Sequence, residues 1–570
     1  HGAAILAVST VIVKAIGALF KIPLNNLLDG VGMAYFSSAY TIFNTLYALS
    51  VAGLPVAVSR LVSQNVVLGR YRDIKKILKI SRWLFICTGT LGFLVMLWAA
   101  RPFSVLVKNP GAFLAIAVMS PAVMFCCMTA AYRGYYQGLS NMYPTAASQG
   151  VEAVAKLLFG TSLAWLTIRR LEEEYAASGT ILGMAVTDSA QAGVMVSQYA
   201  AAAAIGGIVV STLFGTLYCW GRYLLGGDGI SHRQIEGSPA PKSSRSIVRE
   251  MAAVALPVCL GAVVLNVTSL IDMVSIMSCL EKAVERDGGL VWRMYAPYLH
   301  EDLRMQDLPA YLYGCYSGIS VTMFNLVPAL TSTIGVSALP AVTAAWVSRQ
   351  GEKIRRNIES VLRVTAIVAF PAGIGLSVMA KPAAALVFSR SPLEAAVGGQ
   401  LLQLLGLAAV LVALSTPINS VLQAIGRITT PVKLMLLGAV VKLAVNYCLI
   451  QVPGVNIQAA PAGTLACYGV IVALSLWKLA DAAQIQLDWG SVFGKPLAAA
   501  VLCGVTARTS YGLLLDSLPG ALATLGAIGL AAIVYAISLL LLGGICRQDV
   551  LMLPKGEKIA KLLEKHRLLG

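Results

Sequence analysis

The amino-acid sequence predicts an all-α polytopic membrane protein with fourteen transmembrane helices, forming two parallel six-helix lobes around a central cavity plus two C-terminal helices. Three observations lead to this prediction. The 570-residue chain is 58% hydrophobic and only 12% charged, whereas about a quarter of the residues in an average soluble domain are charged. Apolar runs of roughly twenty residues, enough to cross a bilayer, recur from end to end. Segments of the first half also recur in the second half in the same order.

The apolar runs are continuous and lack the alternation of a membrane β-strand, so they predict helices. In chain order, the predicted spans are 3–23, 33–56, 80–99, 111–130, 145–167, 196–222, 252–275, 313–342, 360–380, 399–420, 431–450, 459–479, 494–514 and 520–545. The run at 3–23 carries two lysines and no cleavage site, which predicts a span rather than a signal peptide, at a chain start that looks trimmed. Segment 168–195 begins too polar for a span, and we expect a loop containing a helix start.

Lysine and arginine residues collect on alternate loops, at 70–79, 233–249 and 349–356, and in the tail at 555–567. The positive-inside rule therefore predicts that both termini lie in the cytoplasm. The net charge of +17 then reflects these loops rather than nucleic-acid binding. The tail at 547–570 predicts a basic amphipathic helix on anionic membrane lipids, and a solvated tail is the alternative.

Motifs for catalysis or cofactor binding are missing from the sequence. It contains no GxxxxGK[ST] loop, nucleophile elbow, HExxH motif or metal-type Cys/His spacing. No stretch outside the predicted spans exceeds about forty residues, which is too short for an enzymatic domain. We expect neither an enzyme nor a bound metal or cofactor.

The internal repeat is the most informative feature of the chain. GLPVAVSRLVS at 53–63 matches ALPAVTAAWVS at 338–348, and ARPFSVLV at 100–107 matches AKPAAALV at 380–387. Gln137 precedes Lys156 by nineteen residues, as Gln423 precedes Lys442, with Pro144 and Pro431 between them. An even number of spans in each unit makes the two copies parallel, the layout of a transporter that alternates its access around a cavity.

The repeat divides the chain into five predicted parts. These are an N-lobe (1–225), a basic cytoplasmic linker (226–250), a C-lobe (251–480), two last helices (481–546) and the basic tail (547–570).

Charged residues inside predicted spans need a reason, since each costs at least about 2.5–3.5 kcal/mol at mid-bilayer. Glu152 and Lys156 stand at i and i+4, where they either neutralise each other or face the cavity and handle substrate. The second copy keeps Lys442 but has Gly438 at the glutamate position, which favours the functional alternative. Basic groups in a wet cavity suit a phosphate or pyrophosphate head group.

Two sets of candidate site residues follow. The residues predicted to bind an anionic head group are Lys14, Lys21, Arg60, Arg133 and Lys156. The residues predicted to couple transport or set the polarity of the cavity are Gln137, Glu152, Asp272, Asn325, Gln423, Lys442 and Asn446.

The run from ILAVSTVIVKAIGALFKIPLNNLLDG through GLPVAVSRLVS, followed by AYRGYYQGLSNMYPTAASQGVEAVAK, resembles the stage V sporulation protein B branch of polysaccharide exporters. That branch belongs with the MurJ-type lipid II flippases in the MOP superfamily, which includes MATE-like transporters. The resemblance implies fourteen helices in two lobes. It also implies movement of an undecaprenyl-pyrophosphate-linked sugar across a bacterial plasma membrane, with the lipid tail in a groove along the last two helices.

The resemblance carries over to individual residues only in part. Lys14 and Lys21 fall near two basic positions of the first flippase helix, whereas Tyr47 and Val321 stand near positions that are arginine in those proteins. Asp272 matches an acidic position that some relatives use in a cation site. Lys442 stands where those relatives place ion ligands. A fixed ammonium group there could take the place of a sodium ion, so no sodium site is predicted.

We therefore expect a monomeric flippase of lipid-linked saccharides for cell-wall or spore-envelope synthesis, with envelope-synthesis enzymes as candidate partners. The first alternative is a MATE-type drug/cation antiporter, which would need a net negative cavity. The second is a membrane scaffold for envelope synthesis that transports nothing.

Overall fold

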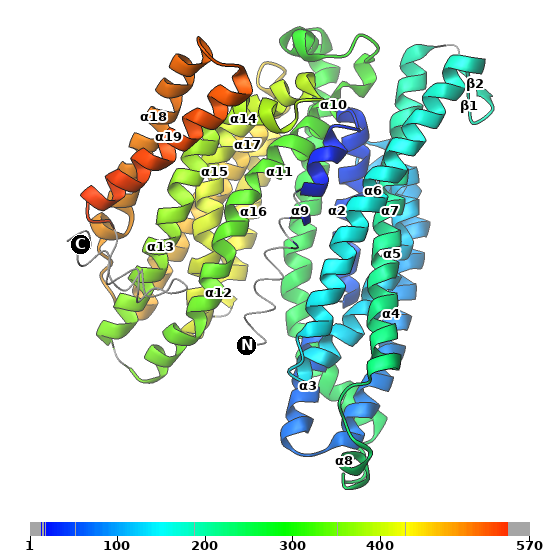
Figure 1. Cartoon of the computed structure of the whole chain (residues 1–570), viewed down its shortest axis with the longest axis vertical. Helices are drawn as coiled ribbons and strands as arrows, with labels where there is room; N and C mark the ends of the chain where they lie inside the picture. The colour runs from blue at the N-terminus through cyan, green and yellow to red at the C-terminus, as the bar shows by residue number, and fades with distance from the viewer. Residues whose placement is uncertain are drawn as a thin grey trace. The chain divides into compact units, whose positions relative to one another are not determined.

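The computed structural model describes residues 13, 16–17, 19–51, 53–186, 188–349, 351–427 and 429–544. These residues are almost entirely helical, as the apolar periodicity predicts (Figure 1). The only strands among them are β1 (Thr180–Ile181) and β2 (Met184–Ala185), which pair antiparallel in a small hairpin.

By its internal contacts the chain forms two units, and the first comprises His1–Lys282 and His300–Gly314. Its longest helices are α2 (Gly30–Val51), α3 (Leu54–Val67), α4 (Tyr71–Leu106), α5 (Phe113–Gly138), α6 (Tyr143–Ser178), α7 (Ser189–Gly226) and most of α9 (Ser244–Tyr295). The short elements are η1 (Pro110–Ala112), α8 (His232–Glu236), η3 (Met305–Asp307) and α10 (Leu308–Cys315).

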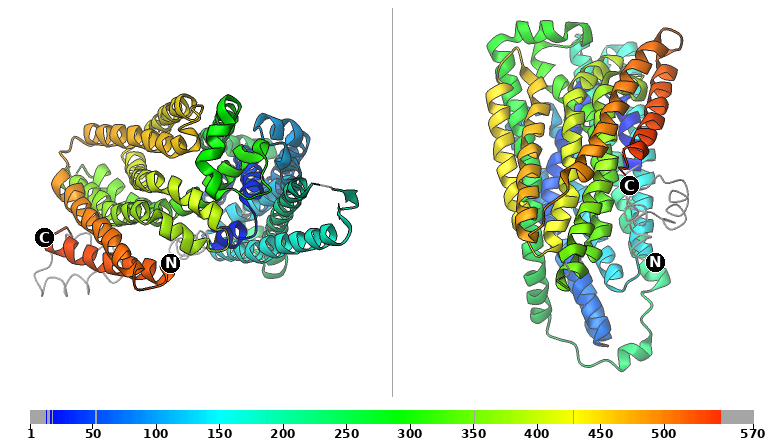
Figure 2. Two further views of the ribbon diagram at one scale, coloured as in Figure 1. Left: turned by 90° about the horizontal axis from the view of Figure 1, so that it is seen from above. Right: turned by 90° about the vertical axis from the view of Figure 1, so that its left-hand side faces the viewer.

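The second unit comprises Ala283–Leu299 and Cys315–Gly570. Its helices are η2 (Ala296–Tyr298), η4 (Tyr316–Ser320), α11 (Val321–Phe324), α12 (Leu326–Val347), α13 (Gly351–Val378), α14 (Ala380–Val387), α15 (Pro392–Ala424), α16 (Thr429–Leu449), η5 (Asn456–Gln458), α17 (Ala459–Ala483), η6 (Gly490–Gly494), α18 (Lys495–Leu515) and α19 (Gly520–Leu541). Figure 2 shows α18 and α19 packed side by side.

Eleven helices among the described residues are long and apolar enough to cross a membrane. Each coincides with one of the predicted spans, so the chain is a multi-pass membrane protein. The other three predicted spans, 3–23, 252–275 and 313–342, contain residues or side chains outside the described set.

The polar segment 168–195 is partly helical. Helix α6 continues to Ser178 and ends at Gly179, the hairpin follows, and α7 begins after Asp188, whose side chain accepts a hydrogen bond from the N–H of Ala190 at 3.1 Å. The expected helix start is confirmed. The extra turns of α6 were not predicted. Their charged side chains indicate a loop when only the hydropathy of the sequence is considered, but an exposed helix end tolerates such side chains.

The contact boundary between the units falls later in the chain than the predicted lobe boundary at 250. The segment 252–275 packs within the first unit, where the hydroxyl of Thr45 donates to the carbonyl of Asn266 at 3.3 Å. The N–H of Gly53 also donates to the sulfur of Cys259 at 3.1 Å. A repeat in the sequence shows which segments are copies of each other, whereas the contacts between helices show which unit a segment packs in.

Helix pairs α6–α7 and α16–α17 share one contact register, each within its own unit. In the first pair, Gly160 touches Gly207. In the second, Asn446 occupies the place of Gly160 and lies against Gly463. The next contact of each pair lies two turns away. In the first pair, Glu152 of α6 touches Gly215, which stands eight residues after Gly207 on α7. In the second pair, Gly438 of α16 touches Ile471, which stands eight residues after Gly463 on α17.

The corresponding lysines of the two copies also stand at the same distance from the start of their helices. Lys156 stands thirteen residues after Tyr143, the first residue of α6, and Lys442 thirteen residues after Thr429, the first of α16. The repeat found in the sequence therefore recurs in the packing of the helices. The two copies differ in which helix carries the large side chain of this glycine contact. In the first copy it is Glu152 of α6, and in the second it is Ile471 of α17.

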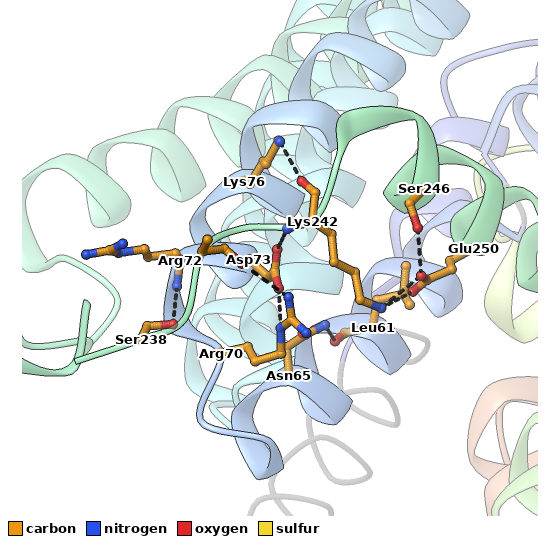
Figure 3. Close-up of polar contacts among 11 residues, drawn as sticks. Leu61, Asn65, Arg70, Arg72, Asp73, Lys76, Ser238, Lys242, Ser246 and Glu250 are labelled. Carbon is orange, nitrogen blue, oxygen red and sulfur yellow. Dashed lines mark hydrogen bonds and ion pairs between the residues drawn. The ribbon is translucent and has the colours of Figure 1, made fainter. Parts of the chain in front are cut away.

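The linker that follows α7 is fastened to the start of α4. The side chain of Asp73 is 1% exposed and pairs with Arg70 at 2.6 Å. It also accepts the N–H of Lys242 at 2.7 Å, as Figure 3 shows. Lys76 donates to the carbonyl of Lys242 at 2.6 Å. The linker predicted from its basic composition is therefore an ordered strap.

A second fastening lies at the other end of this strap. Asp228 pairs with Lys75 at 2.5 Å and accepts the hydroxyl of Tyr135 at 2.5 Å. Its side chain is 4% exposed. Burial by itself would raise the pKa of Asp228, but hydrogen bonds from Lys75, Tyr135 and the N–H of Ile230 outweigh it and lower the pKa below its ordinary value.

Candidate functional site

A cluster of charged and aromatic side chains in the first unit contains four of the predicted site residues. Arg133 on α5 pairs with Glu152 on α6, with 2.9 Å between Nη2 and Oε2. The Nε–H of Arg133 donates to the hydroxyl of Ser148 at 2.8 Å, one turn earlier on α6. Both charged side chains are about four-fifths buried, with 18% and 21% exposed. Two hydrogen bonds therefore fix the guanidinium between α5 and α6.

The space for Glu152 is made by a glycine on the neighbouring helix. A Cβ atom at Gly215 of α7 would lie 2.5 Å from Oε1 and 2.6 Å from Cγ of Glu152. Any other residue would force the carboxylate to move. Gly215 therefore positions Glu152 for its contact with Arg133.

Lys156 is held by aromatic rings instead of a carboxylate. Its Nζ lies 4.8 Å from the ring centroid of Tyr40 and 5.0 Å from that of Phe20. It also donates to the Tyr40 hydroxyl at 3.4 Å. Cation–π contacts stabilise an ammonium group without neutralising it, so its positive field stays available to a ligand.

The intrahelical pairing of Glu152 with Lys156 is not formed: no ion pair joins these two described residues, and Glu152 pairs with Arg133. The reason is geometric. Arg133 offers a planar fork that also reaches Ser148, whereas the lysine stem extends toward the rings of Tyr40 and Phe20.

Lys21 completes the cluster. It lies in the helical segment 19–25, close enough to Lys156 for the two positive charges to repel. Neither ammonium has a carboxylate within ion-pair distance among the described residues. With Arg133 balanced by Glu152, the cluster keeps two uncompensated positive charges, which suits an anionic ligand with two or more charged oxygens.

An aromatic stripe on α2 supports the cluster, and sequence reasoning missed it. Phe36, Tyr40, Phe43 and Tyr47 follow one another at spacings of four, three and four residues, and neighbouring ring centroids lie 5.8–6.1 Å apart. This spacing places them on one helix face and was a detectable signal. Tyr47 lies near Arg133 and Glu152 at the far end of the stripe.

Three other candidates of the first unit lie outside this cluster. Arg60 is exposed on α3, Gln137 is half-buried on α5 one turn beyond Arg133, and Asp272 is half-buried on α9. Lys14 lies outside the described residues.

The remaining candidates belong to the second unit. Asn325 is exposed between α11 and α12, and Gln423 is exposed near the end of α15. Lys442 and Asn446 stand one turn apart on α16 and both lie against Gly463 of α17. Asn446 is fully buried and Lys442 half-buried, so the second copy also carries a lysine in a packed helix pair.

Comparison with protein families gives two matches. A family model described as "Polysaccharide biosynthesis protein" matches residues 1–349. A second model, described as "Lipid II flippase MurJ", matches residues 321–520. Together they span most of the described chain.

Three proteins of Bacillus subtilis (strain 168) are similar in sequence. The lipid II flippase MurJ is 23% identical over 461 residues, covering 79% of this chain and 77% of that protein. Stage V sporulation protein B is 20% identical over 557 residues, covering 97% of both chains. The uncharacterized membrane protein YabM is 22% identical over 575 residues, covering 100% of this chain and 97% of that protein.

Two solved structures share the fold. The lipid II flippase MurJ in an inward closed conformation matches with a TM-score of 0.59 at 12% identity, covering 94% of this chain and 97% of the other. An inward-facing MATE-family multidrug transporter of the MOP superfamily matches with a TM-score of 0.59 at 14% identity, covering 84% of this chain and 99% of the other.

Proposed function

The chain belongs to the polysaccharide biosynthesis protein family, and on that premise we propose that it is a secondary transporter that flips an undecaprenyl-pyrophosphate-linked saccharide across the membrane by alternating access. Lipid II and a polysaccharide precursor are both substrates of this class. The product would serve cell-wall or spore-envelope synthesis. Similarity to a lipid II flippase and to stage V sporulation protein B supports the substrate class.

One observation carries this proposal: the cluster around Lys156 holds two positive charges without carboxylate partners inside apolar helices. Lys156 and Lys21 would bind the pyrophosphate, because neither charge is neutralised by the protein. Arg133, fixed by Glu152 and Ser148, would add a directed guanidinium at the same site. Because a charge inside the membrane is costly, we expect these side chains to serve the transport function.

We further propose the fourteen-helix, two-lobe architecture, with both termini in the cytoplasm of a bacterial plasma membrane. The eleven membrane-spanning helices and the shared register of α6–α7 and α16–α17 support a duplicated transporter. The strap of basic residues along the start of α4 suits the cytoplasmic side. No bound metal or cofactor takes part in this proposal.

The two last helices would hold the lipid tail. Helices α18 and α19 pack on each other and on Met379 through small residues such as Ala507 and Ala527. Their outer faces expose large apolar side chains, including Leu513, Leu522 and Ile533. An isoprenoid chain would find an apolar surface there without displacing polar groups.

A drug/cation antiporter is less well supported. A cationic drug would meet net repulsion from Lys21, Lys156 and Arg133, against a single carboxylate in the cluster. The MATE-like structural match concerns the fold.

Reconstitution tests the proposal. The full chain would be placed in liposomes that contain a fluorescent undecaprenyl-pyrophosphate saccharide, and the rate at which the probe reaches the opposite leaflet would be measured. We expect transfer well above empty liposomes, and reduced transfer in the single variants Lys14→Gln, Lys156→Gln and Lys442→Gln. No transfer by folded protein, with or without an imposed ion gradient or membrane potential, would overturn the proposal.

A further inference from the structure

A groove on the first unit is lined by residues other than those of the cationic cluster, and its shape and lining suit a second ligand. Its floor is α5, through Phe125, Met128 and Tyr132, and α5 packs against both α4 and α7. Helix α4 forms one wall and α7 the other. The cavity has a volume of about 410 Å³, within the range of about 300–1,000 Å³ typical of small-ligand sites.

The walls are mostly apolar. Helix α4 contributes Arg82, Trp83 and Ile86, and α7 contributes Leu217 and Trp220. The guanidinium of Arg82 is the only charged group among these lining residues. An acyl chain would bury apolar surface along such walls.

The depth of this groove in the bilayer follows from the sequence of α4. Between Arg82 and Arg101 lie the eighteen uncharged residues 83–100, about 27 Å of helix at 1.5 Å per residue. A bilayer's hydrocarbon core is about 30 Å thick. Arg82 therefore stands at the boundary between hydrocarbon and head groups.

Exposed indoles mark the same boundary. Trp83 is 65% exposed and Trp98, near the other end of the uncharged stretch, 83% exposed. Trp220 on the facing helix is 49% exposed. Tryptophan concentrates at both membrane interfaces, so the groove opens at head-group level.

Arg82 has no acidic partner among the residues that the structure describes. Its guanidinium lies 5.9 Å from the ring centroid of Tyr223, and no carboxylate among the described residues lies within ion-pair distance of it. Lys75 also lies over the Tyr223 ring, at 5.8 Å, but is already paired with Asp228. Lys79 stands on the same face of α4, between Lys75 and Arg82, and is exposed.

We propose that this groove binds one anionic phospholipid, with its phosphate at Arg82 and Lys79 and an acyl chain between α4 and α7. An uncompensated arginine at the interface, beside an apolar groove, fits a lipid that carries both a negative head group and a hydrocarbon chain. The site is separate from the proposed saccharide-lipid site around Lys156. With both termini in the cytoplasm, as proposed above, the lipid would lie in the inner leaflet, and this is the one part of the inference that rests on the proposed orientation.

The two indoles provide the measurement. Full-length protein would be titrated with phosphatidylglycerol carrying brominated acyl chains, which quench nearby tryptophan fluorescence, and separately with brominated phosphatidylcholine. We expect a saturable quenching component at several-fold lower mole fraction of phosphatidylglycerol. It should disappear in the double variant Trp83→Phe/Trp220→Phe. Equal quenching by the two lipids would overturn the proposal.

Charge variants separate a specific site from general attraction. Arg82→Gln should weaken the phosphatidylglycerol component about fivefold. The matched control Arg233→Gln removes one positive charge from exposed helix α8 and should leave it unchanged. If Arg82→Gln and Arg233→Gln weakened the phosphatidylglycerol component equally, the proposed site would be wrong.

If Arg82→Gln fails to fold, Lys79→Gln replaces it, because the Lys79 side chain is exposed. A lowered preference for phosphatidylglycerol supports the site, and an unchanged preference contradicts it.

Discussion

The carboxylate of Glu152 on α6 fills the space that a Cβ atom would take at Gly215 on α7, 2.5 Å from Oε1. The same carboxylate reaches Arg133 on α5. The absence of a side chain at Gly215 thus allows α5, α6 and α7 to meet around the charged pair of Arg133 and Glu152.

Gly215→Ala should push the carboxylate of Glu152 away from Arg133 and lower the free energy of unfolding by about 1–3 kcal/mol, as overpacking generally does. Thermal unfolding of the purified protein measures this. Gly206→Ala on the same helix is the matched control, because its Cβ would meet nothing nearer than 3.8 Å.

A double-mutant cycle sharpens this prediction. Glu152→Ala empties the space, so Gly215→Ala should cost almost nothing in that background. Equal costs in both backgrounds would show that the two positions do not interact.

Tyr40→Leu should weaken the hold on Lys156, since it removes the ring 4.8 Å from the ammonium. The expected cost is about 1–2 kcal/mol of unfolding free energy, the range for a desolvated cation–π contact plus ring packing. Tyr40→Phe keeps the ring and should behave much like the wild type. A large loss in Tyr40→Phe would mean that the 3.4 Å hydrogen bond, rather than the ring, holds the lysine.

The strap after α7 should loosen in acid. The pKa of Asp228 is lowered in the folded protein, so its stabilising contribution is complete above the unfolded value of about 3.9 and is lost as pH falls through the folded value. We expect the melting temperature of the wild type to fall more steeply below about pH 4 than that of Asp228→Asn. Parallel profiles for the two proteins would contradict this role.

Asp73→Ala should release the other end of the strap. The substitution removes the 2.6 Å ion pair with Arg70 and the 2.7 Å hydrogen bond from the N–H of Lys242. Each such bond to a charged group contributes about 1.5–3 kcal/mol. Limited proteolysis should then cut within 227–243 several-fold faster. Glu236→Ala, an exposed side chain in the same segment, is the control and should be cut at the wild-type rate.

Eleven of the predicted membrane spans are confirmed, and they were readable from sequence because bilayer thickness imposes a length on every apolar run. The starts of α6 and α16 were also readable, through Pro144 and Pro431 near the first turn of each helix. The duplication emerged from the same spacing and recurs in the contacts of Gly160 and Asn446.

The charge partners were not readable. Arg133 and Glu152 lie nineteen residues apart on different helices, and their pairing depends on how α5 and α6 are rotated and on the space left by Gly215. The i,i+4 rule favoured Glu152 with Lys156 because it considers one helix alone. Sequence similarity likewise does not record the close approach of Gly53 to α9, which packs that helix against the start of α3.

The central claim is that Lys156 binds the pyrophosphate of a lipid-linked saccharide, and its most direct test is the transfer rate of the fluorescent lipid in liposomes containing wild type, Lys156→Gln or Lys156→Arg. Lys478→Gln is the control, since Lys478 also lies over an aromatic ring, Trp477 at 4.3 Å, but on an exposed face of α17. We predict a loss of at least tenfold in Lys156→Gln, about 1.4 kcal/mol of lost transition-state binding. Lys156→Arg should partly restore transfer, and Lys478→Gln should match the wild type. Wild-type transfer by a folded Lys156→Gln protein would contradict the claim.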